Sequence, residues 1–261
     1  MKKSKSKIWI VLLIVLLLLI LFCIAYIIYR TSSIEKENQE YKNLASSVAT
    51  RIENTEMTSP SIDVELADNP VDFAALQNQN DEIYAWIYIP DTNVNYPICQ
   101  SKTDDNFYLE HDIYGNYSFA GTIYSQSCNN TNFTDRVTLL YGHNMADGSM
   151  FADIHKFSDS DFFDKHRYFY IYTSGHKLKY EVVSAYIYDD RHIMNSFDFS
   201  KDEVFTEYLD YITNPRSLTK SVRDGVSLDI DDKVVTLSTC LNSGEGRYLV
   251  QGVLTEDELT K

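Results

Sequence analysis

One cysteine near the C-terminal end of the chain stands in a context suited to nucleophilic chemistry. The apolar run Val234–Leu237 before Cys240 predicts a buried strand, and a second β-like run begins at Arg247 after a short link that contains glycine. If these strands are adjacent and antiparallel, the two side chains can meet on one face of the sheet. A thiol beside a fixed cation loses its proton more readily, and its thiolate is a strong nucleophile. The alternative, a core cysteine and a surface arginine, is left open by the spacing alone.

A thiol nucleophile requires a nearby base or cation, and the chain contains six histidines. His143 is the best placed, because it follows the strand-like run Val137–Tyr141 and so lies in a loop at a strand end. The other five stand among charged or helical residues and are interpreted as surface histidines: His111, His155, His166, His176 and His192. A lone histidine is more often structural than catalytic, so the prediction depends on the combination of His143, Cys240 and Arg247.

The N-terminus predicts a membrane anchor. Four lysines among the first seven residues precede Ile8–Tyr29, a run of 22 residues without a charged side chain, and Arg30 ends the run. A helix of that length spans the hydrocarbon core of a bilayer. The positive-inside rule keeps the lysines in the cytoplasm and puts the remainder of the chain outside the cell.

Two other interpretations of this segment fit less well. The apolar core of a cleavable signal peptide has only about 7–15 residues and ends in small residues, whereas this chain has the bulky run Tyr26–Tyr29. A lipid-modified Cys23 would require a small residue in the place of Phe22. We therefore predict a single-pass cell-membrane protein with four regions: a cytoplasmic tail (1–7), a transmembrane signal anchor (8–29), a juxtamembrane helix and linker (30–72) and an extracellular catalytic domain (73–261).

The charge of the extracellular part excludes one class of partner. The first 30 residues contain five basic side chains and no acidic one, so the remainder has 18 basic against 38 acidic side chains, a net charge of −20. A nucleic-acid-binding surface is basic, so we expect no nucleic-acid partner. The same charge opposes docking of this domain on anionic lipid.

Cysteine usage leaves disulfide pairing open. Cys99, Cys128 and Cys240 lie outside the membrane segment, so at least one thiol is unpaired in a monomer. Whether Cys99 and Cys128 pair does not follow from spacing. The chain has no Cys-x-x-Cys pair and no EF-hand-like run of acids, so we expect no metal site and no cofactor.

The part of the chain after the anchor predicts a mainly β fold. Eight segments rich in tyrosine, isoleucine and valine have the composition of half-buried strands. They cover residues 83–89, 94–98, 121–125, 137–141, 167–173, 177–188, 233–239 and 247–254. Eight short strands in one domain of sufficient size suggest a closed or nearly closed barrel.

Helices are predicted before the barrel and between its strands. Ser32 and Glu35 form a capping-box pattern that would begin a helix, which ends before Pro60. Residues 59–70 are polar, acidic and proline-containing, which indicates a linker or a surface arm. Further helices are predicted at Phe73–Leu76, Met150–Phe157 and Lys201–Thr213. The last of these is inserted before the strand that ends in Cys240.

The motifs around the candidate residues resemble those of one family. Leu140–Met145 reads LYGHNM and Thr236–Cys240 reads TLSTC, and Arg247 follows. Together they are similar to the signature of the sortases, cysteine transpeptidases of Gram-positive cell surfaces. The resemblance covers about residues 73–254 and implies an eight-stranded sortase-type β-barrel.

Three further stretches resemble class B sortases in particular. They are Asn80–Pro97, the segment from Asp105 to Tyr124, and the helix at Lys201–Thr213 before the catalytic strand. The chain differs at Tyr124–Gln126, where family members often have phenylalanine and then an acidic residue. The interval of seven residues from Cys240 to Arg247 is also short for class B.

The resemblance implies a reaction and its partners. The substrates would be secreted proteins with a C-terminal LPxTG-like or NPxTx-like sorting signal, and Cys240 would form a thioester with the threonine of that motif. An amine of a peptidoglycan precursor would then release the product, and no cofactor is needed because one amide is exchanged for another. His143 would act as acid and base, and Arg247 would orient the substrate and stabilise the oxyanion.

Further site residues and alternative functions follow from the same resemblance. Ser238, Thr239 and Tyr124 would contribute to substrate binding, although Ser238 and Thr239 could equally be simple β-formers. One alternative function is a hydrolytic cysteine peptidase with the same three residues, in which water resolves the thioester. Others are a pilin-polymerising sortase, which uses a lysine amine, and an anchored β-barrel that only binds.

Overall fold

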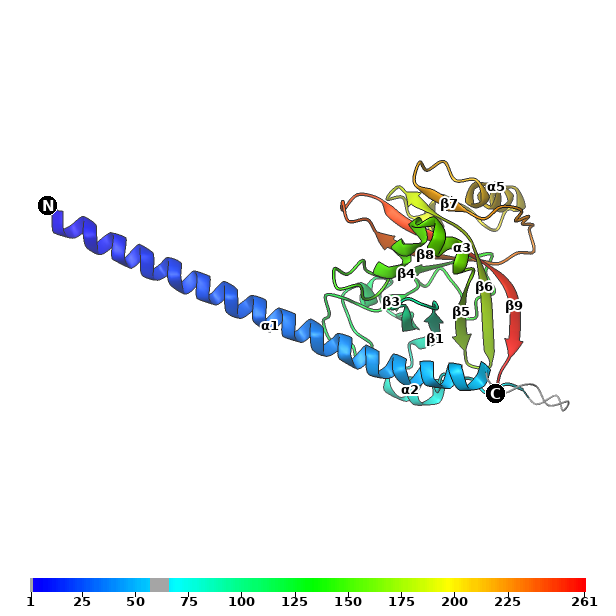
Figure 1. Ribbon diagram of the computed structural model, residues 1–261, viewed down its shortest axis with the longest axis horizontal. Helices are drawn as coiled ribbons and strands as arrows, with labels where there is room; N and C mark the ends of the chain where they lie inside the picture. Colours follow the sequence, from blue (N-terminus) through cyan, green and yellow to red (C-terminus); the bar gives the residue numbers. More distant parts are fainter. Residues whose placement is uncertain (1, 57–65) are drawn as a thin grey trace. The chain divides into compact units, whose positions relative to one another are not determined.

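The computed structural model describes residues 2–56 and 66–261, and the chain divides into two compact units, Met1–Leu44 and Ala45–Lys261 (Figure 1). Most of the predicted linker therefore lies outside the described residues. Residues 67–69 do lie within them, and they pair with the end of the chain. The Lys261 amide donates to Ala67 O at 3.0 Å, and the Asn69 amide donates to Lys261 O at 3.1 Å. This part of the predicted linker is thus an arm on the second unit.

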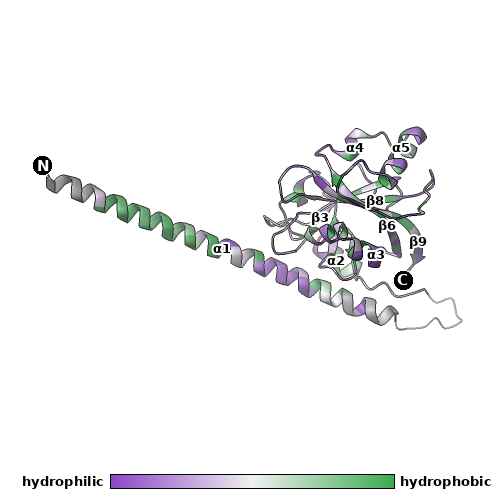
Figure 2. Ribbon diagram, turned by 45° about the horizontal axis from the view of Figure 1, so that its top comes forward, coloured by the Kyte–Doolittle hydropathy of each residue, from purple (hydrophilic) through white to green (hydrophobic). Residues whose placement is uncertain are grey.

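The N-terminal helix α1 (Lys2–Glu56) is continuous, so the predicted helix start at Ser32 is wrong. The sequence from residue 2 to residue 56 contains neither glycine nor proline, and nothing else there ends a helix. Next to the predicted start, Thr31 Oγ1 donates to Ile27 O at 2.9 Å, a bond back along the same helix. Figure 2 shows an apolar stretch of α1 followed by a polar one.

Among the described residues α1 is the one helix long and apolar enough to cross a membrane. Its most apolar window has a mean hydropathy of 3.5, and none of that window is buried. An apolar surface of this kind on a helix fits a membrane anchor.

In the described residues of the second unit, one sheet of nine strands is found, and eight of these strands close a barrel. Figure 1 shows the barrel strands. The order is β5-β1-β2-β3-β4-β8-β9-β6, and β5 pairs with β6 to complete the ring. The barrel strands are β1 (Ile83–Tyr88), β2 (Asn95–Cys99), β3 (Ile123–Tyr124), β4 (Val137–Tyr141), β5 (Tyr168–Thr173), β6 (His176–Tyr188), β8 (Val234–Cys240) and β9 (Arg247–Leu259). The eight predicted strands and the closed barrel are confirmed.

The ninth strand was not predicted. β7 (Lys220–Val222) pairs with β6 on the outside of the closed ring. It has three residues and no apolar alternation, and its side chains are exposed or half-buried. Strand β7 forms because β6 has a free edge with which it can pair. The sequence of β7 alone does not indicate this pairing.

Helices and short 3₁₀ segments lie between the strands. They are α2 (Phe73–Gln79), η1 (Phe107–Leu109), η2 (Ala152–Ser158), α3 (Ser160–Lys165), α4 (Ile193–Ser196) and α5 (Asp202–Thr213). The prediction at Met150–Phe157 corresponds to η2, which is a 3₁₀ segment. The predicted helix before the strand that ends in Cys240 is α5, and it begins one residue later than expected.

Helix α5 covers one side of the barrel with the apolar face that its sequence predicts. Phe205, Tyr208, Leu209 and Ile212 are buried in one core cluster with residues of β4, β6, β8 and β9. This packing supports the two strands that end and begin at Cys240 and Arg247.

Shortening Ile212 to alanine should lower the free energy of unfolding by about 2–5 kcal/mol, because the side chain is fully buried and its loss leaves a cavity. Urea denaturation followed by circular dichroism measures the change. Glu207→Ala, on the exposed face of the same helix, is the matched control and should change stability by less than about 0.5 kcal/mol. Equal losses in the two variants would contradict the packing described here.

Candidate active site

Cys240 and Arg247 lie opposite each other at the ends of two adjacent antiparallel strands. Cys240 is the last residue of β8 and Arg247 the first of β9, and the two form the final pair of that ladder. Arg247 Nη1 donates to Cys240 Sγ at 2.6 Å. The guanidinium thus places a fixed positive charge and an N–H donor directly against the sulfur.

His143 reaches the same end of the barrel through β4, which is parallel to β8. The last pair of this ladder joins Tyr141 to Ser238, and the Gly142 amide donates to Ser238 O at 3.2 Å. β4 ends at Tyr141 and β8 ends at Cys240, so His143, two residues beyond the end of β4, follows that strand at the end of the barrel where Cys240 lies. The order β4-β8-β9 therefore brings His143, Cys240 and Arg247 to one end of three neighbouring strands.

The turn into His143 depends on Gly142. A Cβ atom at this position would lie 2.5 Å from Ile123 Cδ1 and 2.7 Å from the Phe151 ring, so a larger residue would displace the turn. Thr239 Oγ1 donates to Gly142 O at 2.7 Å and ties the end of β8 to the end of β4.

The imidazole of His143 is held by a backbone carbonyl. Its Nε2 lies 2.8 Å from Leu109 O, and since a carbonyl only accepts, this nitrogen carries the hydrogen. In the neutral ring the lone pair is then on Nδ1. The ring of Phe119 lies nearly parallel to the imidazole, with 6.2 Å between centroids.

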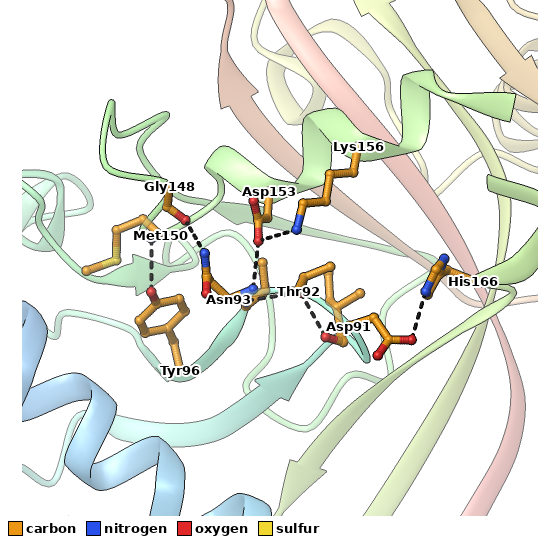
Figure 3. Close-up of polar contacts among 11 residues, drawn as sticks. Asp91, Thr92, Asn93, Tyr96, Gly148, Met150, Asp153, Lys156 and His166 are labelled. Carbon is orange, nitrogen blue, oxygen red and sulfur yellow. Dashed lines mark hydrogen bonds and ion pairs between the residues drawn. The ribbon is translucent and has the colours of Figure 1, made fainter. Parts of the chain in front are cut away.

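The segment that carries the histidine, residues 142–151, is called the His143 loop from here on. Phe151 N donates to His143 O at 2.9 Å and closes the loop at its base. Near its tip, Asn93 Nδ2 donates to Gly148 O at 3.2 Å, and Met150 N donates to the Tyr96 hydroxyl at 3.2 Å (Figure 3).

The turn between β1 and β2 is held in place in the same close-up (Figure 3). Asp153 Oδ2 accepts from the Asn93 amide at 2.7 Å and from Lys156 Nζ at 2.9 Å. The turn also contains Asp91 at φ +58°, whose carboxylate contacts His166 Nε2 at 2.9 Å. The His143 loop is thus supported by a second, fixed turn.

Arg247 is positioned by the turn before it. Gly246 has φ +86°, and a Cβ there would lie 2.9 Å from Tyr188 O, so the position requires glycine. The Gly246 amide donates to Asp190 Oδ1 at 3.0 Å, and the same oxygen is 4.0 Å from Arg247 Nε. This ion pair is largely exposed, so it orients the guanidinium more than it stabilises the fold.

The three residues expected to bind substrate are buried. The exposed fractions of Ser238, Thr239 and Tyr124 are 4%, 2% and 4%. The Thr239 hydroxyl makes a hydrogen bond within the protein, to Gly142 O. Tyr124 stacks on Tyr141 with 5.3 Å between centroids.

Tyr124 nevertheless lies close to Cys240 and Arg247. Burial raises the pKa of its hydroxyl to about 12, the charge of Arg247 opposes that rise, and Cys240 adds to it. The hydroxyl of Tyr124 therefore remains protonated at neutral pH.

Two residues at the site were missed. Asn144 Nδ2 and His155 Nε2 both contact the carbonyl oxygen of Cys240, each at 3.1 Å. Burial lowers the pKa of His155, so its ring is neutral and donates through Nε2, and it stacks on Tyr248 with 4.7 Å between centroids. The interpretation of His155 as a surface histidine is wrong. Of these two residues, only Asn144 could have been found from the sequence, because it directly follows His143.

Metal ligands do not gather in the described parts of the chain. Over residues 2–56 and 66–261 no group of three or more histidine, cysteine, aspartate or glutamate side chains could hold an ion. What the site offers is a thiol, an imidazole and a guanidinium, the groups needed for acyl transfer through a thioester.

Comparison with known proteins identifies the family. Residues 87–255 match the model of the Sortase domain. Sortase B of Listeria monocytogenes serovar 1/2a is 35% identical over 226 residues, which is 84% of this chain and 85% of that protein. The crystal structure of sortase B from B. anthracis in complex with AAEK1 superimposes with a TM-score of 0.68 at 32% identity and covers 85% of this chain and 97% of that one.

A Staphylococcus aureus sortase B–substrate complex has a TM-score of 0.70 over 85% of this chain and 97% of that one. Its identity is 24%, so it shows the fold alone. The family match and the Listeria relative extend across the barrel and the site. The chain therefore belongs to the sortase family, as a class B cysteine transpeptidase.

Proposed function

We propose that this enzyme joins secreted proteins to a peptidoglycan amine with Cys240, His143 and Arg247 as its catalytic residues. The observation that supports the proposal most directly is the contact between Arg247 Nη1 and Cys240 Sγ at 2.6 Å, beside the strand end that leads to His143. The substrates are proteins with an LPxTG-like or NPxTx-like sorting signal. Membership of the sortase family supports a substrate of this class.

The first half of the reaction breaks the amide bond of the sorting signal. The Cys240 thiolate attacks the carbonyl carbon of the motif's threonine and forms a tetrahedral intermediate. As the carbon–nitrogen bond breaks, His143 in its imidazolium form gives a proton to the leaving amine. Because Nε2 donates to Leu109 O, the proton that moves is the one on Nδ1. A thioester on Cys240 remains.

The second half reverses these roles. The amine of the peptidoglycan precursor attacks the thioester, His143 takes its proton, and the sulfur leaves as a thiolate. Amide replaces amide, so the exchange requires no external energy source.

Arg247 stabilises the negative charge of both intermediates. A guanidinium has five N–H donors and stays protonated, so it can contact the sulfur and the developing oxyanion but cannot act as a base. Ser238, Thr239 and Tyr124 contribute by holding the strand ends around the pair, since their side chains are buried.

The apolar part of α1 anchors the enzyme in the cell membrane, with the lysines in the cytoplasm and the barrel outside. The hydropathy and exposure of α1 support the anchor, and the lysines at its start support the orientation. An anchor confines the enzyme to the surface where a lipid-linked amine and an exported protein meet, which raises their effective concentration.

A panel of sorting-signal peptides incubated with the full chain in detergent tests the proposal. With an added amine, mass spectrometry should detect the aminolysis product, and without it a slow hydrolysis product. Hydrolysis alone at every amine concentration would assign a peptidase instead. Exclusive use of a lysine side chain on a protein acceptor would assign pilin polymerisation.

A further inference from the structure

The ladder between β4 and β8 ends just before the reactive residues. In a parallel ladder the hydrogen bonds recur every two residues along each strand. The Gly142 amide donates to Ser238 O, so the next bond would join the amide of residue 144 to Cys240 O. The His143 loop leaves the sheet at this point, and the side-chain amide of Asn144 makes that bond instead, with Nδ2 at 3.1 Å from Cys240 O.

Both contacts of this amide fix its orientation. Asn144 Nδ2 also donates to Asn242 Oδ1, at 2.8 Å, in the turn between β8 and β9. Both partners are acceptors, so the NH₂ group must point toward them and the amide cannot be turned over. The backbone of Asn144 pairs with Met150 across the His143 loop, and this pairing fixes the backbone from which the side chain extends.

The carbonyl of Cys240 receives a second donor, His155 Nε2. This donor comes from η2, which follows the His143 loop in the sequence. The two donors occupy both lone pairs of the oxygen. Hydrogen bonds from Asn144 and His155 therefore attach the backbone of Cys240 to the His143 loop and to η2, in addition to the pairing of its own strand β8.

We infer that Asn144 is a positioning residue that fixes His143 relative to Cys240. The inference rests on the proposed function, in which a proton moves between an imidazole and groups bound at the sulfur. His143 and Cys240 belong to segments whose last shared contacts are at Gly142, one residue before the histidine. Asn144 adds a contact one residue after the histidine, so the imidazole lies between two attachments to the end of β8.

The test compares three variants of the full chain. Asn144→Ala removes the hydrogen bond to Cys240 O. A displacement of the reacting groups by roughly 1 Å lowers the reaction rate by up to about 100-fold. We expect kcat for acyl transfer to fall about 10- to 100-fold, with KM within about twofold of wild type. Asn242→Ala removes only the second partner of the amide and should retain most of the activity. Asn132→Asp is the matched surface control, because its exposed Oδ1 still accepts from Thr134.

Two measurements separate positioning from a loss of structure. The rate of Cys240 alkylation by iodoacetamide, and its dependence on pH, should be unchanged in Asn144→Ala, because the contact with Arg247 remains. The thermal midpoint should stay within a few degrees of wild type. An unchanged kcat, or a loss of alkylation and stability that parallels the loss of kcat, would overturn the inference.

A third measurement requires no turnover. Modification of Cys240 by a methanethiosulfonate should shift the imidazole NMR signals of His143 in wild type, and the shift should be at least halved in Asn144→Ala. An equal shift in both proteins would overturn the inference even if no substrate is found. Absence of any aminolysis product from wild type, with the NMR difference present, would refute the proposed function alone.

Discussion

Replacing Cys240 by alanine abolishes both the thioester and the transfer product. Removal of a covalent nucleophile costs at least about 10⁴-fold in rate, and no neighbouring group in the site can take its place: His143 has no carbonyl-attacking role here and Arg247 stays protonated. The side chain is half-exposed, and alanine keeps its Cβ, so the fold should persist. Intact-protein mass spectrometry after incubation with a sorting peptide detects the acyl-enzyme, and chromatography quantifies the product.

The other cysteines provide the control. Partial desolvation, and then the charge of Asp105, raise the pKa of the Cys128 thiol, and burial raises the pKa of Cys99. Iodoacetamide should therefore label Cys240 ahead of both. Cys128→Ala, the same chemical change at an exposed position, should leave the transfer rate at the wild-type level. Acyl-enzyme formation in Cys240→Ala would refute the assignment of the nucleophile.

The contact of Cys240 with Arg247 could be predicted from the local sequence. A strand, a short glycine-containing link and a second strand make an antiparallel pair, and such a pair brings its own ends together. The position of His143 depends on the parallel pairing of β4 with β8, between segments nearly one hundred residues apart in the chain. The periodicity of the sequence does not show which distant strands pair. The prediction that His143 lies near Cys240 therefore rested on the resemblance of the motifs to a known family.

The errors have two physical origins. Ser32 matched a capping pattern, but an N-cap requires a helix that begins there, and α1 continues through Ser32 because neither glycine nor proline interrupts the chain from residue 2 to residue 56. His155 stands in a predicted helix beside the charged Lys156, yet η2 turns its ring against Tyr248 and the Cys240 carbonyl. Strand β7 forms only because β6 presents an edge. For His155 and β7, tertiary context overrides the local signal.

Replacing Arg247 by alanine should lower kcat/KM for acyl transfer by about 10²–10³-fold, the loss measured when one oxyanion donor is removed elsewhere. Two effects combine here. The oxyanion loses a donor, and Cys240 Sγ loses the cation that lies 2.6 Å away. The second effect predicts slower alkylation by iodoacetamide at neutral pH, which distinguishes this variant from Asn144→Ala.

Arg247→Lys tests whether charge alone is sufficient. An ammonium group has the charge but neither the planar fork nor the five donors, so it cannot contact the sulfur and an oxyanion with the same geometry. We expect Arg247→Lys to recover most of the alkylation rate and only part of the transfer rate. Arg216→Ala, at an exposed arginine outside the site, should change neither. If Arg247→Ala kept wild-type transfer, the contact between guanidinium and sulfur would have a structural role only, and the oxyanion would be stabilised by backbone amides near Cys240.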